Sequence, residues 1–393
     1  MTNLLEILNS INNSPWIESL GPWITYWQWE SQCNPNSVFN PNFKGFNLIK
    51  KGPKDPKEIQ YIALPPELTN YYRGIDFRYL ASYKFGEEIS KFAQLMIDKF
   101  PSNNLIMFYN NINELKINTF DKSFNDKKEH LKNLIFKRGS KTLTAASYSD
   151  AFNRISVPKV GGEVHLPHEL FHMSTSFKSK EKNVSFCGFE QKQLNILQTI
   201  GTGINEGYTE LMVQKYYGDD YLSNSTSYIL LRKVMGAIES IIGKEKMENY
   251  YLTANLNGLV NELAQYAKYE DVLKFISSMD FVHNNFNASI VKNQKNQLLL
   301  LDQLIFVNAF IITIGTNKPI KQLSDNEITK DQLASLIAKN CSKSFNFTLG
   351  GKEYITSPNS EQLQAMIIRL LKNQGIEAEV KVNDQEETNK MSR

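Results

Sequence analysis

The stretch His168-Glu169-Leu170-Phe171-His172 decides how this chain is interpreted, because it places two histidines four positions apart with a glutamate beside the first. On an α-helix, residues four apart lie within roughly 40° of each other around the axis, so both imidazoles can reach one zinc ion. The glutamate then faces the same cleft, where it can take a proton from the attacking water. The pentapeptide therefore predicts a zinc-binding helix that carries its own general base.

A catalytic zinc ion needs a third protein ligand and an open fourth position. The best candidate lies in Gly203-Ile204-Asn205-Glu206-Gly207-Tyr208-Thr209-Glu210, where Asn205 suits a helix start and Gly218 its end. Glu206 and Glu210 lie one turn apart on one face of this helix. One carboxylate can bind the metal while the other accepts the free N–H of a ligating histidine. The alternative is an ordinary amphipathic helix with two solvated glutamates.

The two motifs together, His168-Glu-x-x-His172 and Asn205-Glu206-x-x-Thr209-Glu210, resemble those of the gluzincin zinc metallopeptidases, the thermolysin-like group. The resemblance covers residues 164–217, and the gap between the two helices is longer than in compact members of the group. It implies a zincin-like fold and assigns a role to each matched residue: zinc ligands His168, His172 and Glu206, general base Glu169, and Glu210 as the acid behind a ligating histidine.

Members of this group supply a Tyr or His from the C-terminal side to stabilise the oxyanion. Tyr208 and His283 are our candidates, although no local pattern marks either and other tyrosines compete, namely Tyr216, Tyr217, Tyr250 and Tyr251. His165 precedes the zinc helix at its mouth, where it could touch substrate or act as an alternative ligand; a solvent-exposed histidine is the simpler interpretation. Cys187 could place a thiol near the site, but we favour an incidental cysteine.

Composition indicates a globular protein of two or three subdomains. The chain has 393 residues, 41% of them hydrophobic, and a net charge of +3, which implies neither nucleic acid nor an anionic membrane as partner. Three widely spaced cysteines, Cys33, Cys187 and Cys341, argue against a disulfide framework and fit a reducing compartment. No signal peptide is visible, and the apolar stretch 298–314 carries polar residues and predicts a buried helix. We therefore expect a cytoplasmic protein without a transmembrane segment.

The chain predicts an α+β fold in four parts. Residues 1–125 form an N-terminal α/β region that begins with all four tryptophans, contains a helix over 79–100 and a buried strand over 105–109. Residues 126–218 form the zincin-like core, with a hairpin of strands 141–148 and 152–157 whose edge could pair with an extended peptide. A helical part at 219–375 completes the cleft, and 376–393 is a flexible tail.

Helical spacing within the third part predicts five helices, over 223–242, 246–266, 293–314, 329–340 and 360–374. Thr329 and Gln332 form a capping box for the fourth, and strands 345–349 and 352–355 form a hairpin around Gly350-Gly351.

These features predict a zinc-dependent metallopeptidase that acts on a peptide or protein substrate. Two alternatives remain open: a zinc-stabilised binding protein without catalysis, and an effector protease that cleaves one host protein. The substrate, endo- or exopeptidase action and the oligomeric state do not follow from the sequence.

Overall fold

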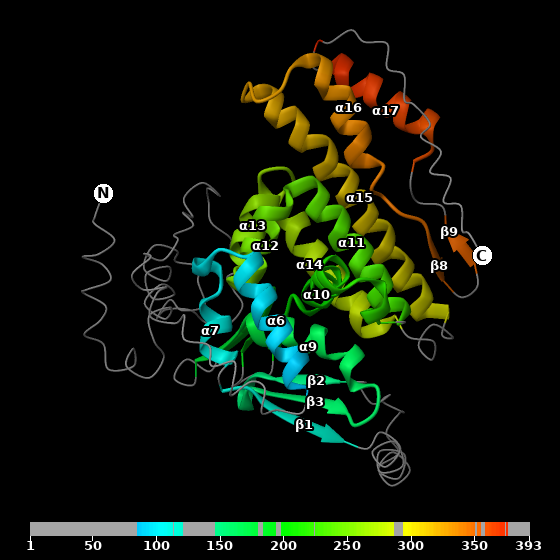
Figure 1. Ribbon diagram of the computed structural model, residues 1–393. Helices are drawn as coiled ribbons and strands as arrows, with labels where there is room; N and C mark the ends of the chain where they lie inside the picture. The colour runs from blue at the N-terminus through cyan, green and yellow to red at the C-terminus, as the bar shows by residue number, and fades with distance from the viewer. Residues whose placement is uncertain are drawn as a thin grey trace, which may run out of the picture.

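The structure is a computed structural model of the 393-residue chain. It describes residues 85–112, 114–120, 146–179, 184–193, 198–223, 225–286, 294–349, 352–354, 358–373 and 375. Within these residues the fold is mixed α+β and mostly helical, as predicted, with three small sheets (Figure 1). The tryptophan-rich start and the predicted tail lie outside the described residues.

Two helices open the described chain: α6 (Gly86–Lys99), within the predicted helix, and α7 (Ile106–Ile112). The prediction of a buried strand over 105–109 is wrong, because these residues begin α7. A short apolar run has no periodicity that separates a strand from a helix buried on all sides. Here α7 packs against α9 (Leu166–Ser174) and β4 (Ser176–Ser179), and all of its residues from Ile106 to Tyr109 are buried.

The predicted hairpin is confirmed in its described part as β2 (Ser147–Ser149) and β3 (Arg154–Pro158), which pair antiparallel. A 3-10 turn at Asp150–Phe152 joins them. On the other side of β3, β1 (Lys116–Phe120) pairs in parallel, which gives the order β1-β3-β2. Among the strands that the structure describes, β2 is therefore at an edge. In Figure 1 this sheet lies below α9.

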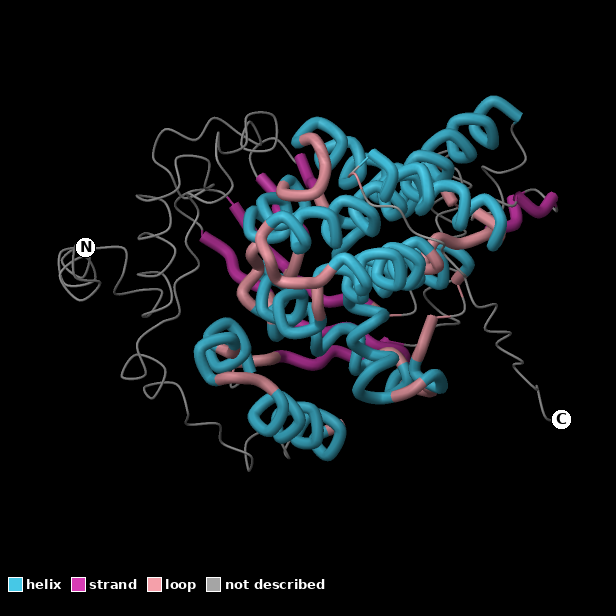
Figure 2. Tube along the Cα trace, turned by 90° about the horizontal axis from the view of Figure 1, so that it is seen from above, coloured by secondary structure: helices cyan, strands magenta, loops and turns pink. Residues whose placement is uncertain are grey.

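A second sheet joins the two predicted zinc helices, and nothing in the sequence analysis anticipated it. After β4, the chain forms β5 (Val184–Cys187), β6 (Glu190–Gln193) and β7 (Gln198–Ile200), all antiparallel to their neighbours. Because side chains alternate along a strand, Phe177 and Phe186 share one buried face while Ser176 and Cys187 share the other. Figure 2 shows the strands in magenta beneath the helices.

The helix that carries the third predicted ligand is α10 (Thr202–Tyr217), and it packs between two longer helices. These are α11 (Thr226–Ile242) and α14 (Tyr269–Asn285). A Cβ added at Gly203 would lie 2.2 Å from the Met279 carbonyl oxygen of α14, and one at Gly207 would lie 2.6 Å from the Leu231 carbonyl oxygen of α11. Both contacts require glycine, because a side chain would separate the backbones.

Asp280 of α14 also holds the start of α10. Its two carboxylate oxygens accept hydrogen bonds from the backbone N–H groups of Gly201 and Gly203, at 2.9 and 2.8 Å. Burial raises the pKa of Asp280 to about 6, and these two hydrogen bonds oppose that rise. The Asp280 side chain thus caps the N-terminus of α10, because the N-cap residue Gly201 has no side chain that could do so.

The predicted helix over 246–266 is wrong as a single element, because the chain forms α12 (Lys244–Leu252) and α13 (Leu256–Ala264) there. Ala254 between them adopts φ +49°, outside the right-handed helical region. The Asn255 side chain then accepts a hydrogen bond from the Gly258 N–H, which caps α13. The apolar spacing continues across this break, so periodicity alone does not reveal it.

The other predicted C-terminal elements are confirmed with shifted ends. They are α15 (Gln294–Ser324), α16 (Lys330–Cys341), α17 (Ser360–Asn373) and the hairpin of β8 (Phe347–Leu349) and β9 (Lys352–Tyr354). The capping box of Thr329 and Gln332 at α16 is present. By length and composition alone, one described helix could cross a membrane, Gln297–Ser324 of α15, and 44% of its most apolar window is buried inside the protein. A core helix of a soluble protein has the same properties.

One continuous hydrophobic core extends from Ile89 of α6 to Phe347 of β8. The described residues of the first three predicted parts contribute to it together, and the predicted boundaries between them stay predictions. A second, smaller core lies between α16 and α17, built around Leu333, Ile337 and Ile367. Buried residues of both α9 and α10 belong to the main core. The core therefore fixes the two helices that carry the predicted metal ligands.

Candidate metal centre

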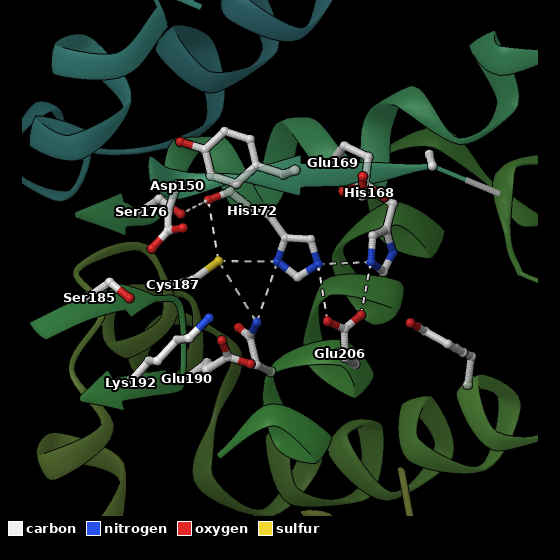
Figure 3. Close-up of a pocket in the computed structure, with 15 residues that line it drawn as sticks. Asp150, His168, Glu169, His172, Ser176, Ser185, Cys187, Glu190, Lys192 and Glu206 are labelled. Carbon is white, nitrogen blue, oxygen red and sulfur yellow. Dashed lines mark hydrogen bonds and ion pairs between the residues drawn. The ribbon is translucent and has the colours of Figure 1, made fainter. Parts of the chain in front are cut away.

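Helices α9 and α10 bring the three predicted metal ligands together. The Nε2 atoms of His168 and His172 lie 2.9 Å apart, and the Glu206 carboxylate lies 3.1 Å from the first and 3.5 Å from the second. All three side chains are nearly buried, with exposed fractions of 12%, 9% and 15%. Figure 3 shows the two rings and the carboxylate converging on one point at the end of the pocket.

The spacing of these ligand atoms fits a tetrahedral zinc ion. With zinc–ligand bonds of about 2.0–2.1 Å, two tetrahedral ligands lie roughly 3.3 Å apart, and the three observed separations bracket this value. Two imidazole nitrogens facing each other at 2.9 Å repel unless a proton or a metal ion lies between them. Two imidazoles and one carboxylate also form a donor set typical of catalytic zinc.

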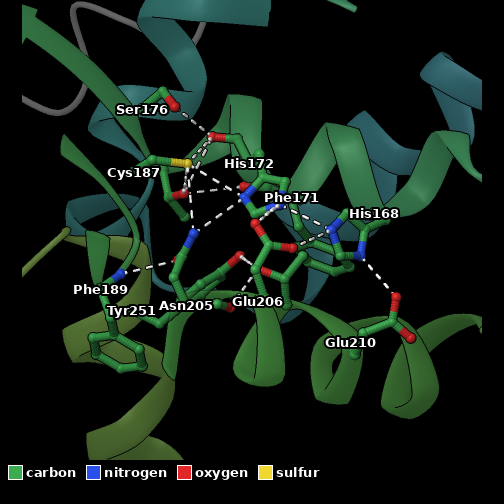
Figure 4. A network of polar contacts seen from close by, with 12 residues as sticks. His168, Phe171, His172, Ser176, Cys187, Phe189, Asn205, Glu206, Glu210 and Tyr251 are labelled. Carbon is green, nitrogen blue, oxygen red and sulfur yellow. Dashed lines mark hydrogen bonds and ion pairs between the residues drawn. The ribbon is translucent and has the colours of Figure 1, made fainter. Parts of the chain in front are cut away.

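The outer nitrogen of each imidazole has its own partner (Figure 4). His168 Nδ1 lies 2.9 Å from Glu210 Oε1, as the resemblance implied, and Glu210 is also held by the Ser223 N–H at 3.1 Å. His172 Nδ1 lies 3.3 Å from Cys187 Sγ and 3.4 Å from Asn205 Nδ2. Such contacts orient the rings so that both Nε2 atoms face the same point.

The two histidines and Glu206 attract one another because the imidazoles favour their charged form and the carboxyl favours its own. Burial lowers the pKa of His168, but hydrogen bonds to Glu206 and Glu210 outweigh this and raise it to about 9. Burial likewise opposes charge on His172 and Glu206. Cys187 and then Glu206 nevertheless raise the pKa of the His172 imidazole, and the two histidines lower the pKa of the Glu206 carboxyl. A metal cation at this point would take the place of the protons.

Glu169, the predicted base, lines the same pocket as the three ligands. It is 7% exposed, and burial raises the pKa of its carboxyl while the neighbouring histidine charges lower it. The backbone N–H of Tyr148 in β2 donates a hydrogen bond to this carboxylate, which ties it to the edge strand. A carboxylate with a raised pKa is suited to accept a proton and to return it.

No family model, curated protein or solved structure matches this chain.

The pocket extends away from the cluster as a cavity of about 240 Å³. Its walls come from β2 and from the polar face of the second sheet, with Ser176, Ser185, Cys187, Glu190 and Lys192 in view in Figure 3. These side chains alternate with the buried face of Phe177 and Phe186. A polar cleft lined by hydroxyls, carboxylates and one amine therefore starts at the cluster and follows the sheet.

The structure does not bring Tyr208, one of our two oxyanion candidates, to this pocket. Tyr208 is fully buried on the far side of α10, where its hydroxyl donates a hydrogen bond to Glu239 and its ring packs on Tyr251. Its position two residues after Glu206 places it on the opposite face of the helix. Tyr208 therefore lies away from the pocket, and we do not propose a catalytic role for it.

His283, the other candidate, does not line the pocket but lies behind a residue that does. Its ring packs edge-on against Tyr228 of α11 with centroids 6.0 Å apart, and among the described residues its Nδ1 has no hydrogen-bond partner. Burial lowers the pKa of His283, so the ring is neutral near pH 7. The predicted His165 lies at the start of α9, partly exposed, between α9 and the preceding 3-10 turn.

Sequence reasoning missed Tyr228 altogether. Its ring lies 5.8 Å from that of His168, its hydroxyl donates a hydrogen bond to Glu206, and it lines the pocket. Tyr228 is one of 18 tyrosines, and no spacing relates it to either motif because α11 reaches the site only through tertiary packing. Cys187, which we expected to be incidental, contacts His172 and also lines the pocket.

Proposed function

We propose that this protein is a zinc-dependent metallopeptidase with a zincin-like catalytic core. One observation carries the proposal: ligand atoms of His168, His172 and Glu206 all lie within 4.8 Å of one another, and Glu169 lines the same cavity. A structural zinc site would fill all four positions with protein and would need no carboxylate base beside it. The three-ligand cluster at the end of an open cleft favours catalysis over a purely structural role.

Bound at this cluster, zinc would polarise a substrate carbonyl and lower the pKa of an attacking water. Glu169 then takes the proton from that water and delivers it to the leaving amine, which restores the carboxylate for the next turnover. The Tyr148 N–H keeps the Glu169 carboxylate in place during both transfers. Glu210 and Cys187 hold the two histidine rings from behind.

Tyr228 takes the oxyanion role in this proposal in place of Tyr208. Burial and the neighbouring Glu206 charge raise the pKa of the Tyr228 hydroxyl, so it keeps its proton and stays a hydrogen-bond donor at any working pH. Its hydroxyl reaches Glu206 at the cluster, so it is close enough to serve as the donor to a carbonyl oxygen bound there. His283 supports the ring from behind.

The edge strand β2 offers the backbone along which a peptide substrate would lie. Ala146, Ser147 and Tyr148 line the pocket, and among the described residues β2 pairs with β3 alone. An extended peptide that adds to this edge is held by main-chain hydrogen bonds, which favours peptides over small amides. We propose a cytoplasmic location, in line with the few, widely spaced cysteines.

The proposal is tested by elemental analysis and by peptide cleavage on the same preparations. Wild type is expected to hold about one zinc per chain, and His168→Ala and Glu206→Ala are expected to lose it. Glu169→Gln should keep the zinc and lose cleavage of a mixed peptide library. Glu163→Gln is the matched control, because Glu163 is exposed in the turn before α9 and should change neither quantity.

The outcomes separate the alternatives. Absence of zinc from reconstituted wild type contradicts the metal centre itself. Zinc in wild type without cleavage of any library peptide favours the zinc-stabilised binding protein instead.

A further inference from the structure

The two candidate zinc ligands on α9 differ in what stands behind them. His168 Nδ1 faces a carboxylate oxygen of Glu210, whereas His172 Nδ1 faces a sulfur and an amide nitrogen, those of Cys187 and Asn205. This difference matters because it decides which atom fixes the proton on the His172 ring. The argument that follows rests on the proposed zinc site.

A neutral imidazole that binds a metal through Nε2 carries its hydrogen on Nδ1. For His172, that N–H must be given an acceptor, since the side chain is nearly buried and an unpaired donor there is costly. Two side chains lie within reach of Nδ1, those of Cys187 and Asn205. The one that presents an acceptor atom to Nδ1 must receive this hydrogen bond.

Asn205 presents the wrong end of its amide. The backbone N–H of Phe189 donates to Asn205 Oδ1 at 3.1 Å, so the oxygen faces the chain at Phe189 and the NH₂ group faces the His172 ring. The neighbouring Gly188 closes the space around that oxygen, because a Cβ added there would lie 2.3 Å from it. Turning the amide round would place its NH₂ group against the Phe189 N–H, donor to donor.

We propose that the Cys187 sulfur is the acceptor that fixes the tautomer of His172 and thereby its readiness to bind zinc. The sulfur lies 3.3 Å from Nδ1, and its own hydrogen has an acceptor in the His172 carbonyl oxygen at 3.5 Å. Asn205 then donates its remaining hydrogen to the same sulfur, at 4.0 Å. Cys187 is thus a positioning residue, acting through His172, in the place that Glu210 holds for His168.

The test measures zinc affinity by competition with a chromophoric chelator and, separately, the His172 Hδ1 resonance in zinc-loaded, ¹⁵N-labelled protein. Cys187→Ala should weaken zinc binding by about 10–100-fold, the usual effect of removing such a partner. The His172 Hδ1 signal should move upfield and exchange faster with water. The His168 Hδ1 signal, held by Glu210, should not change and serves as the internal reference.

A second substitution tests the mechanism by rescue. Adding Asn205→Asp to Cys187→Ala replaces the facing NH₂ with a carboxylate oxygen, which accepts from Nδ1 while the other oxygen keeps the Phe189 N–H. Zinc affinity should return to within a few-fold of wild type. Cys341→Ala is the control for loss of a thiol, because Cys341 is buried in the second core beside Thr316, away from the site.

Asn205→Ala gives an independent answer if Cys187→Ala does not fold. With Cys187 as the acceptor, the His172 Hδ1 signal stays downfield in Asn205→Ala; its loss there would assign the acceptor to Asn205 and overturn the inference. Unchanged zinc affinity and Hδ1 signal in Cys187→Ala would overturn it as well. Failure of wild type to bind zinc is a different result, since it removes the proposed function before any variant is compared.

Discussion

Glu210 and Glu206, one turn apart on α10, contact the two opposite nitrogens of the His168 ring. Glu210 Oε1 lies 2.9 Å from His168 Nδ1. Glu206 reaches His168 Nε2 at 3.1 Å. The ring is therefore held between two carboxylates of one helix, and its orientation follows from the pitch of α10.

Removing the Glu210 carboxylate should loosen the ring without removing a ligand. We expect Glu210→Ala to weaken zinc binding by about 10–100-fold and Glu210→Gln, which keeps an acceptor oxygen, by less. Chelator competition measures both. Glu163→Ala, on the exposed turn before α9, is the control. Equal affinity in Glu210→Ala and wild type would mean that Glu210 does not orient His168.

Zinc affinity should rise with pH because zinc must displace a proton from His168. The pKa of His168 in the metal-free protein is about 9, since hydrogen bonds to Glu206 and Glu210 overcome burial. Below that value, this ring alone costs apparent zinc affinity about tenfold per pH unit. Competition titrations between pH 7 and 9 measure the slope, and a flat profile would contradict the raised pKa.

The stability of the metal-free protein should change in the opposite sense. A histidine whose pKa rises on folding adds stability that is complete below its unfolded value, 6.5 here, and that disappears as pH rises through about 9. Chemical unfolding of metal-free wild type should therefore show a falling free energy of unfolding from pH 7 to 9. His168→Ala, which lacks the ring, should show a shallower fall.

Tyr228→Phe and Tyr208→Phe should separate catalysis from packing. Loss of the Tyr228 hydroxyl should lower kcat by about 10²–10³-fold, as loss of an oxyanion donor does, while zinc content and KM stay near wild type. Tyr208→Phe removes a buried hydrogen bond to Glu239, so it should cost about 1 kcal/mol of unfolding free energy and leave kcat unchanged. Equal effects of the two substitutions on kcat would refute the role of Tyr228.

Gly207→Ala should be strongly destabilising, because the new Cβ would lie 2.6 Å from the Leu231 carbonyl oxygen of α11. We expect the upper end of the about 1–3 kcal/mol that overpacking costs, together with weaker zinc binding as α10 shifts. Gly236→Ala, on α11, is the matched control: its Cβ would meet only a Leu211 methyl at 3.7 Å. It should stabilise the protein by about 0.5–1 kcal/mol through helix propensity.

The sequence predicted the parts of the fold and site that depend on local spacing. Helices α9 and α10, the hairpin before α9 and the capping box at α16 each lie within a few residues of a recognisable pattern. The break at Ala254 and the helical form of 105–109 escaped prediction because apolar periodicity survives both. The second sheet was missed because its strands are only three or four residues long.

Residues that reach the site through tertiary packing could not be predicted. Tyr228 comes from α11, which lies beside α10 because Gly207 allows the two backbones to touch. Asp280 comes from α14, 77 residues after the N–H it binds at Gly203. Neither has a sequence neighbour that marks it. Tyr208, by contrast, was adjacent to the motif, and the helix turned it away from the site.

Side chains alternate between the two faces of the second sheet, so the register of β5 against β4 decides which residue faces His172. Cys187 faces His172, whereas Phe186, one position earlier, faces the core. A one-residue slip of β5 against β4 would exchange them, and the Phe186 ring would meet the imidazole. Homologues and engineered variants should therefore keep this register of β5 against β4, or place another hydrogen-bond acceptor where the thiol lies.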